Sequence, residues 1–427
     1  MLASTTSGAN RQKEIYTNGF AGIKPIVPID AKKLEDAAAA KMSPEAHGYI
    51  LGGAGNESTI HNNRAAFEKY KIVPRMLRNV SERDTSIELF GQKFLSPFLL
   101  SPIGVLEMVH PDADVAVGNA AAEVGMPYIF SNQSSKPMEE VAAAMGDSPR
   151  WFQLYWSKSR ELVVSFVQRA ERCGCSAIAV TLDTTMLGWR TRDLDMAYLP
   201  FMEGRGIAQY TSDPVFQKLM DEFGTDGKSS VPTKSSVPTL SMLSGLITMT
   251  KNYPGHGFFS KLKSGRPIKA VQKFVSIYSN PALTWGDLKF LREQTKLPIL
   301  LKGILHPDDA RLAIDHGMDG IIISNHGGRQ VDGSISTFEA LPKIAEAVNG
   351  NIPILLDSGI RGGADAFKAI ALGAKAVCIG RPYVYGLTIA GQQGVSEVLR
   401  NFLADFDLTM GLAGCKNISE ITRESLM

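Results

Sequence analysis

Residues 298–326 read PILLKGILHPDDARLAIDHGMDGIIISNH, and this stretch decides the fold. An apolar run at 298–302 is followed by a helical pattern at 308–316 and by a second apolar run at 320–324. Short, mostly apolar runs of this kind are typical of buried parallel strands. The stretch therefore predicts a βαβ unit, in which a helix joins two parallel strands.

The same alternation extends over most of the chain. Helical patterns at 112–124, 159–172 and 364–372 separate further apolar runs. Eight runs occur, at 98–102, 128–131, 152–155, 177–183, 298–302, 320–324, 353–357 and 376–380. Eight such units predict an α/β protein with a (β/α)8 TIM barrel. A doubly wound sheet is the alternative, but no Gly-x-Gly-x-x-Gly motif follows an early strand.

The chain has 427 residues, whereas a typical barrel takes about 250. We expect the excess in a helical arm before the barrel and in a long insertion after the fourth strand. Loops after barrel strands line the active face, so the insertion is a candidate lid. Its middle, 226–239, is rich in Ser, Pro, Thr and Lys and is expected to be mobile. The expected single domain, 1–427, comprises a tail at 1–29, the arm at 30–95, a barrel at 96–400 with the insertion at about 184–297, and a tail at 401–427.

Composition excludes several classes of protein. Hydrophobic residues make up 44% and charged residues 21%, as in ordinary globular proteins rather than disordered or collagen-like ones. The net charge is only +2, and no basic run occurs, so no nucleic-acid or membrane-surface partner is expected. No apolar run is long enough to span a membrane.

Cysteine usage bears on the compartment. Four cysteines in a chain of this length favour a reducing compartment, and we expect the cytoplasm. The final Ser425-Leu426-Met427 only loosely resembles a peroxisomal tail, which leaves the peroxisome as the alternative. Cys173 and Cys175 lack a second pair for a zinc site, and Cys378 is expected to be a buried, inert thiol. No metal site is predicted.

The densest polar cluster at a strand end is SNHGGRQ at 324–330. His326 suits acid/base chemistry, because histidine as a residue type titrates near physiological pH. Arg329 carries a planar fork that matches a carboxylate. The cluster therefore predicts acid/base chemistry on an anionic substrate. The alternative is a loop histidine with only a structural role.

The ends of the seventh and eighth strands predict a phosphate site. Loops at these positions are the usual phosphate site of the barrel. Residues 357–363 and 380–382 are rich in glycine and include Arg361 and Arg381. The alternative is that these glycines serve turns and that the arginines lie on the surface.

Other strand ends add complementary groups. Lys302 brings a cation to the barrel mouth, Tyr155 a hydroxyl, and Asp183 a carboxylate that could orient a histidine. The alternative for Lys302 is an ion pair with Asp357.

Together these motifs resemble the FMN-dependent α-hydroxy acid oxidizing enzymes. SNHGGRQVD at 324–332 resembles the signature of that family. The blocks at 152–155, 181–184, 299–303 and 380–382 resemble family blocks in the same order. The likeness extends from about residue 30 to the end, and it implies FMN as the cofactor.

The resemblance implies roles for the reacting groups. His326 resembles the base that accepts the α-hydroxyl proton, or the α-proton in the carbanion version of the mechanism. Asp183 resembles its carboxylate partner, and Lys302 the lysine beside the N1–C2=O edge of the flavin. Tyr155 belongs with this catalytic group. The implied substrate-binding residues are Tyr49, Tyr155, Arg190 and Arg329, with the two arginines on the carboxylate.

The resemblance also implies a set of flavin-binding residues from most of the strand ends. The isoalloxazine contacts, the ribityl contact and the phosphate contacts follow one another along the chain. The implied residues are Pro102, Ile103, Gly104, Ser131, Gln153, Thr181, Lys302, Ser324, Asp357, Ser358, Gly359, Arg361, Gly380 and Arg381.

Within the family, the sequence resembles the lactate 2-monooxygenase branch. Gly104 stands where lactate and glycolate oxidases usually carry alanine, and Ser358 where oxidases tend to carry glycine. The insertion after the fourth strand is also long. Gln133 departs from the large aromatic residue of glycolate oxidase, so a larger or polar 2-hydroxy acid is an alternative to lactate.

The expected reaction is oxidation of L-lactate by O2 to acetate, CO2 and water. A lactate or other 2-hydroxy acid oxidase, which forms the keto acid and hydrogen peroxide, is the alternative. A flavin-free phosphosugar isomerase or lyase and a non-catalytic binding protein are more distant hypotheses. Family likeness suggests a homotetramer or homo-octamer.

Overall fold

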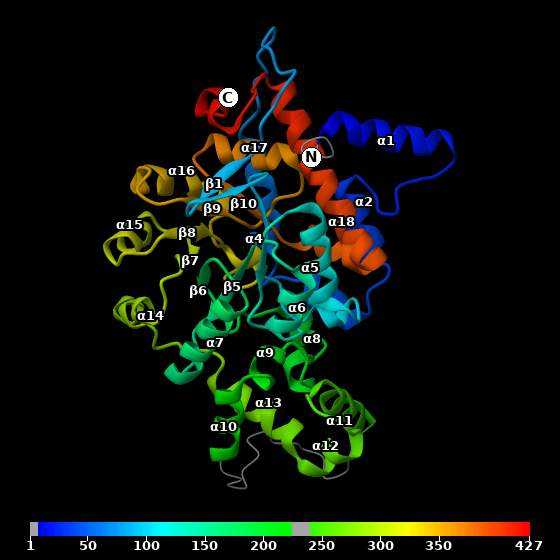
Figure 1. Ribbon diagram of the computed structural model, residues 1–427, viewed down its shortest axis with the longest axis vertical. Coiled ribbons are helices and arrows are strands. Elements are labelled where there is room, and N and C mark those ends of the chain that lie inside the picture. The colour runs from blue at the N-terminus through cyan, green and yellow to red at the C-terminus, as the bar shows by residue number, and fades with distance from the viewer. Residues whose placement is uncertain (1–6, 224–239) are drawn as a thin grey trace.

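Eight parallel strands close into a barrel in the computed structural model, which describes residues 7–223 and 240–427 (Figure 1). Each strand pairs with the next along the chain, and the last pairs with the first. The strands are β3 Phe98–Leu100, β4 Tyr128–Phe130, β5 Arg150–Tyr155, β6 Ile178–Thr181, β7 Ile299–Ile304, β8 Gly320–Ile323, β9 Ile354–Leu356 and β10 Ala376–Ile379. The predicted barrel is confirmed, and each of the eight predicted runs supplies one strand.

One helix of an outer ring follows each barrel strand. Local sequence determines where these helices begin: at α16, Ser336 Oγ accepts from the amide of Glu339, whose carboxylate accepts from the amide of Ser336. The ring helices are α5 Ala113–Val124, α6 Met138–Met145, α7 Arg160–Arg172, α14 Leu288–Gln294, α15 Pro307–Asp315, α16 Thr337–Val348, α17 Gly363–Ala371 and α18 Arg381–Leu412.

Two predicted boundaries differ from the structure. The insertion expected at 184–297 includes α14, which lies in the ring beside α7. The boundary expected at 400 falls inside α18, because that helix continues to Leu412 despite a kink at Ala390 and Gly391.

The segment before the barrel is helical, as expected, but it ends in a two-stranded hairpin. Its elements are α1 Gly8–Phe20, α2 Ala31–Ala39, α3 Pro44–Leu51, α4 Ser58–Ala65, β1 Ile87–Leu89 and β2 Gln92–Phe94. The expected tail at 1–29 thus contains a helix, and α1 packs on α18. In the hairpin, Ile87, Leu89 and Phe94 pack against Trp151 and the lower barrel interior. The hairpin thus packs against the end of the barrel opposite to the carboxyl ends of the strands, where the barrel fold places its ligands.

The insertion after β6 forms a helical layer at the lower end of the molecule in Figure 1. Tyr210 and Phe274 pack edge to face in its interior, with ring centroids 4.8 Å apart. The predicted mobile stretch at 226–239 lies outside the described residues. No helix in the described part of the chain is long and apolar enough to cross a membrane. The elements of the insertion are α8 Thr191–Asp195, η3 Pro200–Glu203, α9 Ala208–Thr211, α10 Pro214–Glu222, α11 Leu240–Asn252, α12 Phe258–Ser264 and α13 Arg266–Ile277.

Candidate active site

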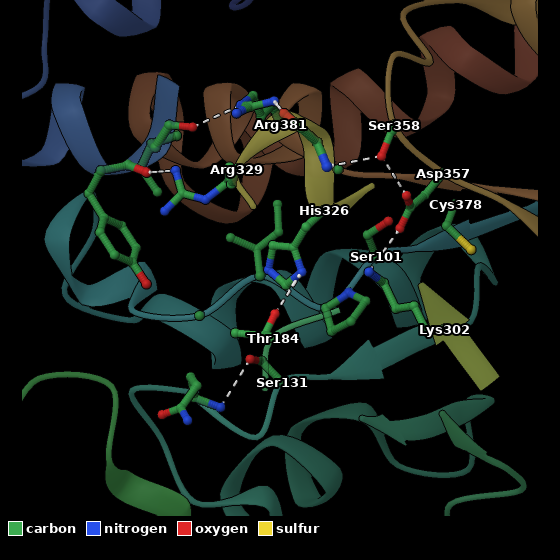
Figure 2. Close-up of a pocket in the computed structure, with 18 of the residues that line it drawn as sticks. Ser101, Ser131, Thr184, Lys302, His326, Arg329, Asp357, Ser358, Cys378 and Arg381 are labelled. Atoms are coloured by element: carbon green, nitrogen blue, oxygen red, sulfur yellow. Dashed lines mark hydrogen bonds and ion pairs between the residues drawn. The ribbon is translucent and has the colours of Figure 1, made fainter. Parts of the chain in front are cut away.

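A pocket at the carboxyl ends of the strands, enclosing about 1130 Å³ up to its mouth, brings most of the predicted site residues together (Figure 2). Its size and its mixture of apolar and polar side chains suit a cofactor together with a small substrate. The predicted residues that line it are Tyr49, Pro102, Ile103, Gly104, Ser131, Tyr155, Arg190, Lys302, His326, Arg329, Asp357, Ser358, Gly359, Arg361, Gly380 and Arg381.

Four predicted residues, Gln153, Thr181, Asp183 and Ser324, do not line the pocket. Three of them form hydrogen bonds behind it. Gln153 Oε1 accepts from Ser131 Oγ (3.3 Å), and Gln153 Nε2 donates to Thr181 Oγ1 (2.9 Å). Ser324 Oγ accepts from Lys302 Nζ at 2.9 Å. These contacts fix the orientation of side chains that face the pocket.

Asp183 lies directly behind His326. The distance from His326 Nδ1 to Asp183 Oδ1 is 2.9 Å, and that to Thr184 Oγ1 is 3.2 Å. An ionised carboxylate only accepts hydrogen bonds, so Nδ1 carries the proton that faces Asp183. Nε2 is then the unprotonated nitrogen, and it accepts a long hydrogen bond of 3.5 Å from the Tyr155 hydroxyl. This is the arrangement of a general base held by a carboxylate.

Burial and charge set the protonation states of this pair. Burial lowers the pKa of His326, although the Asp183 carboxylate opposes this effect. For Asp183, burial alone would raise the pKa, but the nearby His326 and Lys302 outweigh it and lower the pKa to about 2. At neutral pH, Asp183 is therefore ionised and His326 is a neutral base.

The loop that carries His326 is held in an unusual conformation. His326 has a φ of 56°, in the left-handed region that non-glycine residues rarely adopt, and Gly327 and Gly328 follow with φ of 64° and 79°. A side chain at Gly328 would place its Cβ 2.8 Å from the Ile60 amide nitrogen, so the helical arm packs directly on this turn. The Asn325 side chain accepts from the Gly328 amide at 3.1 Å and closes the turn. Strain of this kind is concentrated at functional sites.

Arg190 and Arg329 form a cationic wall beside His326. The Arg329 guanidinium lies 4.8 Å from the centre of the Tyr49 ring, and that of Arg190 lies 6.0 Å from it. Neither arginine forms a salt bridge within the described ranges 7–223 and 240–427. Burial and the nearby Arg190 lower the pKa of Arg329 to about 9. Two neighbouring guanidinium groups without a salt bridge in these ranges favour an anion between them.

A second cationic group lies at the ends of β9 and β10. Arg361 and Arg381 line the pocket beside Gly359 and Gly380, and α18 begins directly after Gly380. Burial and the nearby Arg361 lower the pKa of Arg381, although Tyr385 opposes them. Glycine backbone, a helix N-terminus and two guanidinium groups are the elements of a phosphate site.

Lys302 lines the same pocket as the two cationic groups. Its Nζ lies 3.3 Å from Asp357 Oδ2, so the ion pair considered as an alternative is present, and Lys302 also lines the pocket. Burial would lower the pKa of Lys302, but Asp357 and Asp183 outweigh it and raise the pKa, which keeps the cation charged. Ser358 Oγ donates to Asp357 Oδ1 at 2.7 Å and orients this carboxylate (Figure 2).

Several pocket residues carry no signal in the sequence that marks them as site residues. Cys378 is buried, as expected, but it also lines the pocket. Thr184 stands next to Asp183, and this position is its only sequence signal. No local signal marks the insertion residues, because they reach the pocket only through the tertiary fold. The remaining unpredicted lining residues are Ile50, Ser101, Leu187, Phe201, Tyr278 and Ile360. Gln133 and Gly327, which the sequence analysis singled out without assigning them to the site, also line the pocket.

The described residues contain no group of three or more His, Cys, Asp or Glu side chains that could hold a metal ion. The pocket does fit FMN. Arg361, Arg381 and the start of α18 would hold its phosphate, and Lys302 lines the same pocket. Ser101 Oγ is buried without a partner at the pocket wall, where it can bond to a polyhydroxy chain.

Comparisons with known proteins point to the same cofactor. The family model for FMN-dependent dehydrogenases matches residues 38–427. The chain is 43% identical to an L-lactate oxidase of Lysinibacillus sphaericus over 400 residues, 94% of this chain and 93% of the relative. It is 38% identical to an FMN-dependent alpha-hydroxy acid dehydrogenase of Penicillium citrinum, covering 97% of this chain and 94% of the relative.

A crystal structure of mandelate oxidase with (S)-4-hydroxymandelic acid superposes with a TM-score of 0.76 at 33% identity, covering 94% of this chain and 98% of that one. The fold, the end of the pocket lined by Arg361 and Arg381, and these relatives agree. The chain belongs to the FMN-dependent dehydrogenase family and is an FMN-dependent 2-hydroxy acid oxidoreductase.

Proposed function

We propose that the protein oxidises L-lactate with O2 and acts as an internal monooxygenase that forms acetate, CO2 and water. One observation carries the proposal: the base His326, the carboxylate-binding arginines and residues of the insertion line one pocket. The overall reaction balances, because lactic acid and dioxygen together contain the same atoms as acetic acid, carbon dioxide and water.

Arg190 and Arg329 bind the substrate carboxylate and so orient the α-carbon. The Tyr49 and Tyr155 hydroxyls provide further hydrogen bonds to the substrate. His326 Nε2 accepts the α-hydroxyl proton, while Asp183 holds the imidazole in the correct tautomer and stabilises its cation. FMN, held by Lys302, Arg361 and Arg381, would supply the acceptor for the two electrons and the reductant for O2.

The insertion supports the monooxygenase interpretation of this chemistry. Leu187, Phe201 and Tyr278 extend from it to line the same pocket as His326. If the insertion stays closed over the pocket, it would retain pyruvate beside the hydrogen peroxide formed from O2. Pyruvate and hydrogen peroxide then react to give acetate, CO2 and water. If the insertion opens before they react, pyruvate and hydrogen peroxide both leave the pocket.

A second candidate is an oxidase that releases pyruvate and hydrogen peroxide. It is favoured by the 43% identity to a protein described as an L-lactate oxidase. The two candidates share every residue role above and differ only in whether the product is retained.

Replacing Arg329 with methionine should lower kcat/KM for L-lactate by roughly 10²-fold, mostly through KM, because a charge-assisted pair to the carboxylate is lost. Steady-state kinetics across lactate concentrations test this expectation. Arg329→Lys keeps the positive charge but loses the planar guanidinium group. Its kcat/KM should lie between the values of the wild type and Arg329→Met. A KM within twofold of the wild-type value for Arg329→Met would contradict the assignment.

The pH dependence of kcat/KM should reflect the ionisation of His326 in the free enzyme. Because burial lowers the pKa of His326, kcat/KM for L-lactate should stay level down to about pH 6.5, the ordinary histidine value, and fall only below it. Asp183 opposes this shift, so Asp183→Asn should move the acid limb to still lower pH as well as slow the reaction. An acid limb above pH 7 would show that a different group is the base.

Anaerobic mixing with substrate tests the first half of the proposal. L-lactate should bleach the flavin absorbance of the holoenzyme, whereas D-lactate should not. The same measurement with glycolate and with longer L-2-hydroxy acids shows how large a substrate side chain the pocket accepts beside Gln133. No bleaching by any L-2-hydroxy acid would reject the proposed activity.

We also propose that the protein is a cytoplasmic homotetramer or homo-octamer, with the peroxisome as the alternative location. The four cysteines are all unpaired thiols, which supports a reducing compartment. Apolar side chains exposed on and after α1, including Tyr16 and Phe20, support contacts between subunits.

A further inference from the structure

The insertion is tied to the barrel at a carboxylate outside the predicted site. Glu107 lies in η2 Leu106–Met108, three residues after Gly104 on the loop that follows β3. Its Oε1 accepts from the Gly206 amide at 3.0 Å, and its Oε2 accepts from Asn252 Nδ2 at 2.9 Å. Arg205 Nη1 lies 3.7 Å from the same Oε2. One carboxylate thus contacts two parts of the insertion that are far apart in sequence.

The contact between Glu107 and Gly206 lies next to the wall of the pocket. Gly206 is packed so closely that a Cβ there would lie 2.5 Å from Val105 Cγ2 and 3.3 Å from the Phe201 ring. Phe201 itself lines the pocket. Any movement of Gly206 away from Glu107 would therefore move Phe201 as well.

The loop that carries Glu107 is itself firmly held. The Glu107 amide donates to Ser135 Oγ at 3.1 Å, and the Val105 amide donates to the Gln133 carbonyl at 2.9 Å. Val105 has a φ of 61°, a strained value for a β-branched residue, which fixes the direction of η2. The carboxylate is thus a fixed point of the barrel to which the insertion binds.

From these contacts we propose that Glu107 is a positioning residue that fastens the insertion over the active-site pocket. Glu107 is not among the residues that line the pocket, and it acts by holding Phe201 and its neighbours in the closed position. This inference rests on the proposed function, since the closed position is what would retain pyruvate beside hydrogen peroxide.

The experiment compares Glu107→Gln with Glu203→Gln in the holoenzyme. Glu203 pairs with the same Arg205, at 3.0 Å, but lies within the insertion, so its loss leaves the tie to the barrel intact. Hydrogen–deuterium exchange of the peptide 200–211, which contains the Gly206 amide, reports closure without any turnover. Glu107→Gln should raise that exchange at least about tenfold, because two charge-assisted hydrogen bonds are weakened. Glu203→Gln should leave it near the wild-type rate.

Product analysis with L-lactate is the second readout. Glu107→Gln should release more pyruvate and hydrogen peroxide and less acetate, while its anaerobic rate of flavin reduction stays within about twofold of wild type. Unchanged exchange at 200–211, or raised exchange with an unchanged product ratio, would overturn the inference. A wild-type enzyme that forms only pyruvate and hydrogen peroxide would reject the monooxygenase proposal instead, and exchange alone would then decide whether Glu107 fastens the insertion.

A second variant guards against a folding defect. Asn252 lies at the exposed end of α11, and Asn252→Ala removes only one of the two hydrogen bonds to Glu107. Its exchange at 200–211 should lie between wild type and Glu107→Gln. If Asn252→Ala has full flavin content and the same exchange at 200–211 as the wild type, the result would argue against Glu107 as the residue that holds the insertion.

Discussion

Substitution of glutamine for His326 should slow anaerobic flavin reduction by L-lactate by roughly 10³–10⁴-fold, near the upper limit for a positioned base. The glutamine amide can still face Asp183, but it cannot accept a proton. Stopped-flow absorbance measures this step alone, because no oxygen is present.

Flavin content and lactate affinity separate this loss from misfolding. Arg190 and Arg329 remain in His326→Gln, so binding of lactate or oxalate should stay within about tenfold of wild type. Asp183→Asn is the matched variant, since it leaves the imidazole but removes its partner at 2.9 Å, and its loss should be smaller. Near-normal reduction in His326→Gln would assign the base to another residue.

Lys302→Met should have the second large effect, in both stability and rate. Lys302 Nζ and Asp357 Oδ2 are 3.3 Å apart and almost fully buried, so removal of the cation leaves a buried carboxylate unpaired. Breaking such a pair costs about 3–5 kcal/mol of unfolding free energy. Flavin reduction should also slow, because the cation no longer stabilises negative charge that develops on the ring.

The double variant Lys302→Met with Asp357→Asn distinguishes these two effects. It removes both charges, so thermal unfolding should recover most of the lost stability. The rate of flavin reduction should stay low, because the positive charge is still absent. Recovery of both the melting temperature and the rate would mean that Lys302 has only a structural role.

The barrel was predictable because each strand is a short apolar run, and a helix of the outer ring comes before the next run. The boundaries of the insertion and of the last helix were less predictable. Nothing in the sequence distinguishes α14 from the helices of the insertion before it, because its position in the ring depends on its contact with α7. The hairpin β1–β2 was missed for a similar reason, since its strands have only three residues each.

The pocket lining was predictable where its residues lie at strand ends. His326, Lys302 and Arg381 follow apolar runs, and the barrel brings such positions to one mouth. Phe201 and Tyr278 were not predictable, because they reach the pocket from a helical layer whose path no local pattern reveals. Glu107 also looks like an ordinary surface acid in sequence, and only its contacts with Gly206 and Asn252 indicate a role.

The fate of labelled oxygen tests the central claim most directly. The holoenzyme is given L-lactate under ¹⁸O2 with excess catalase, so that any hydrogen peroxide that escapes is destroyed before it can react with pyruvate in solution. Retention of the products predicts acetate with one ¹⁸O atom in its carboxylate and one acetate formed per O2 consumed. Unlabelled pyruvate as the main product, with no labelled acetate, would contradict the account and identify the protein as an oxidase.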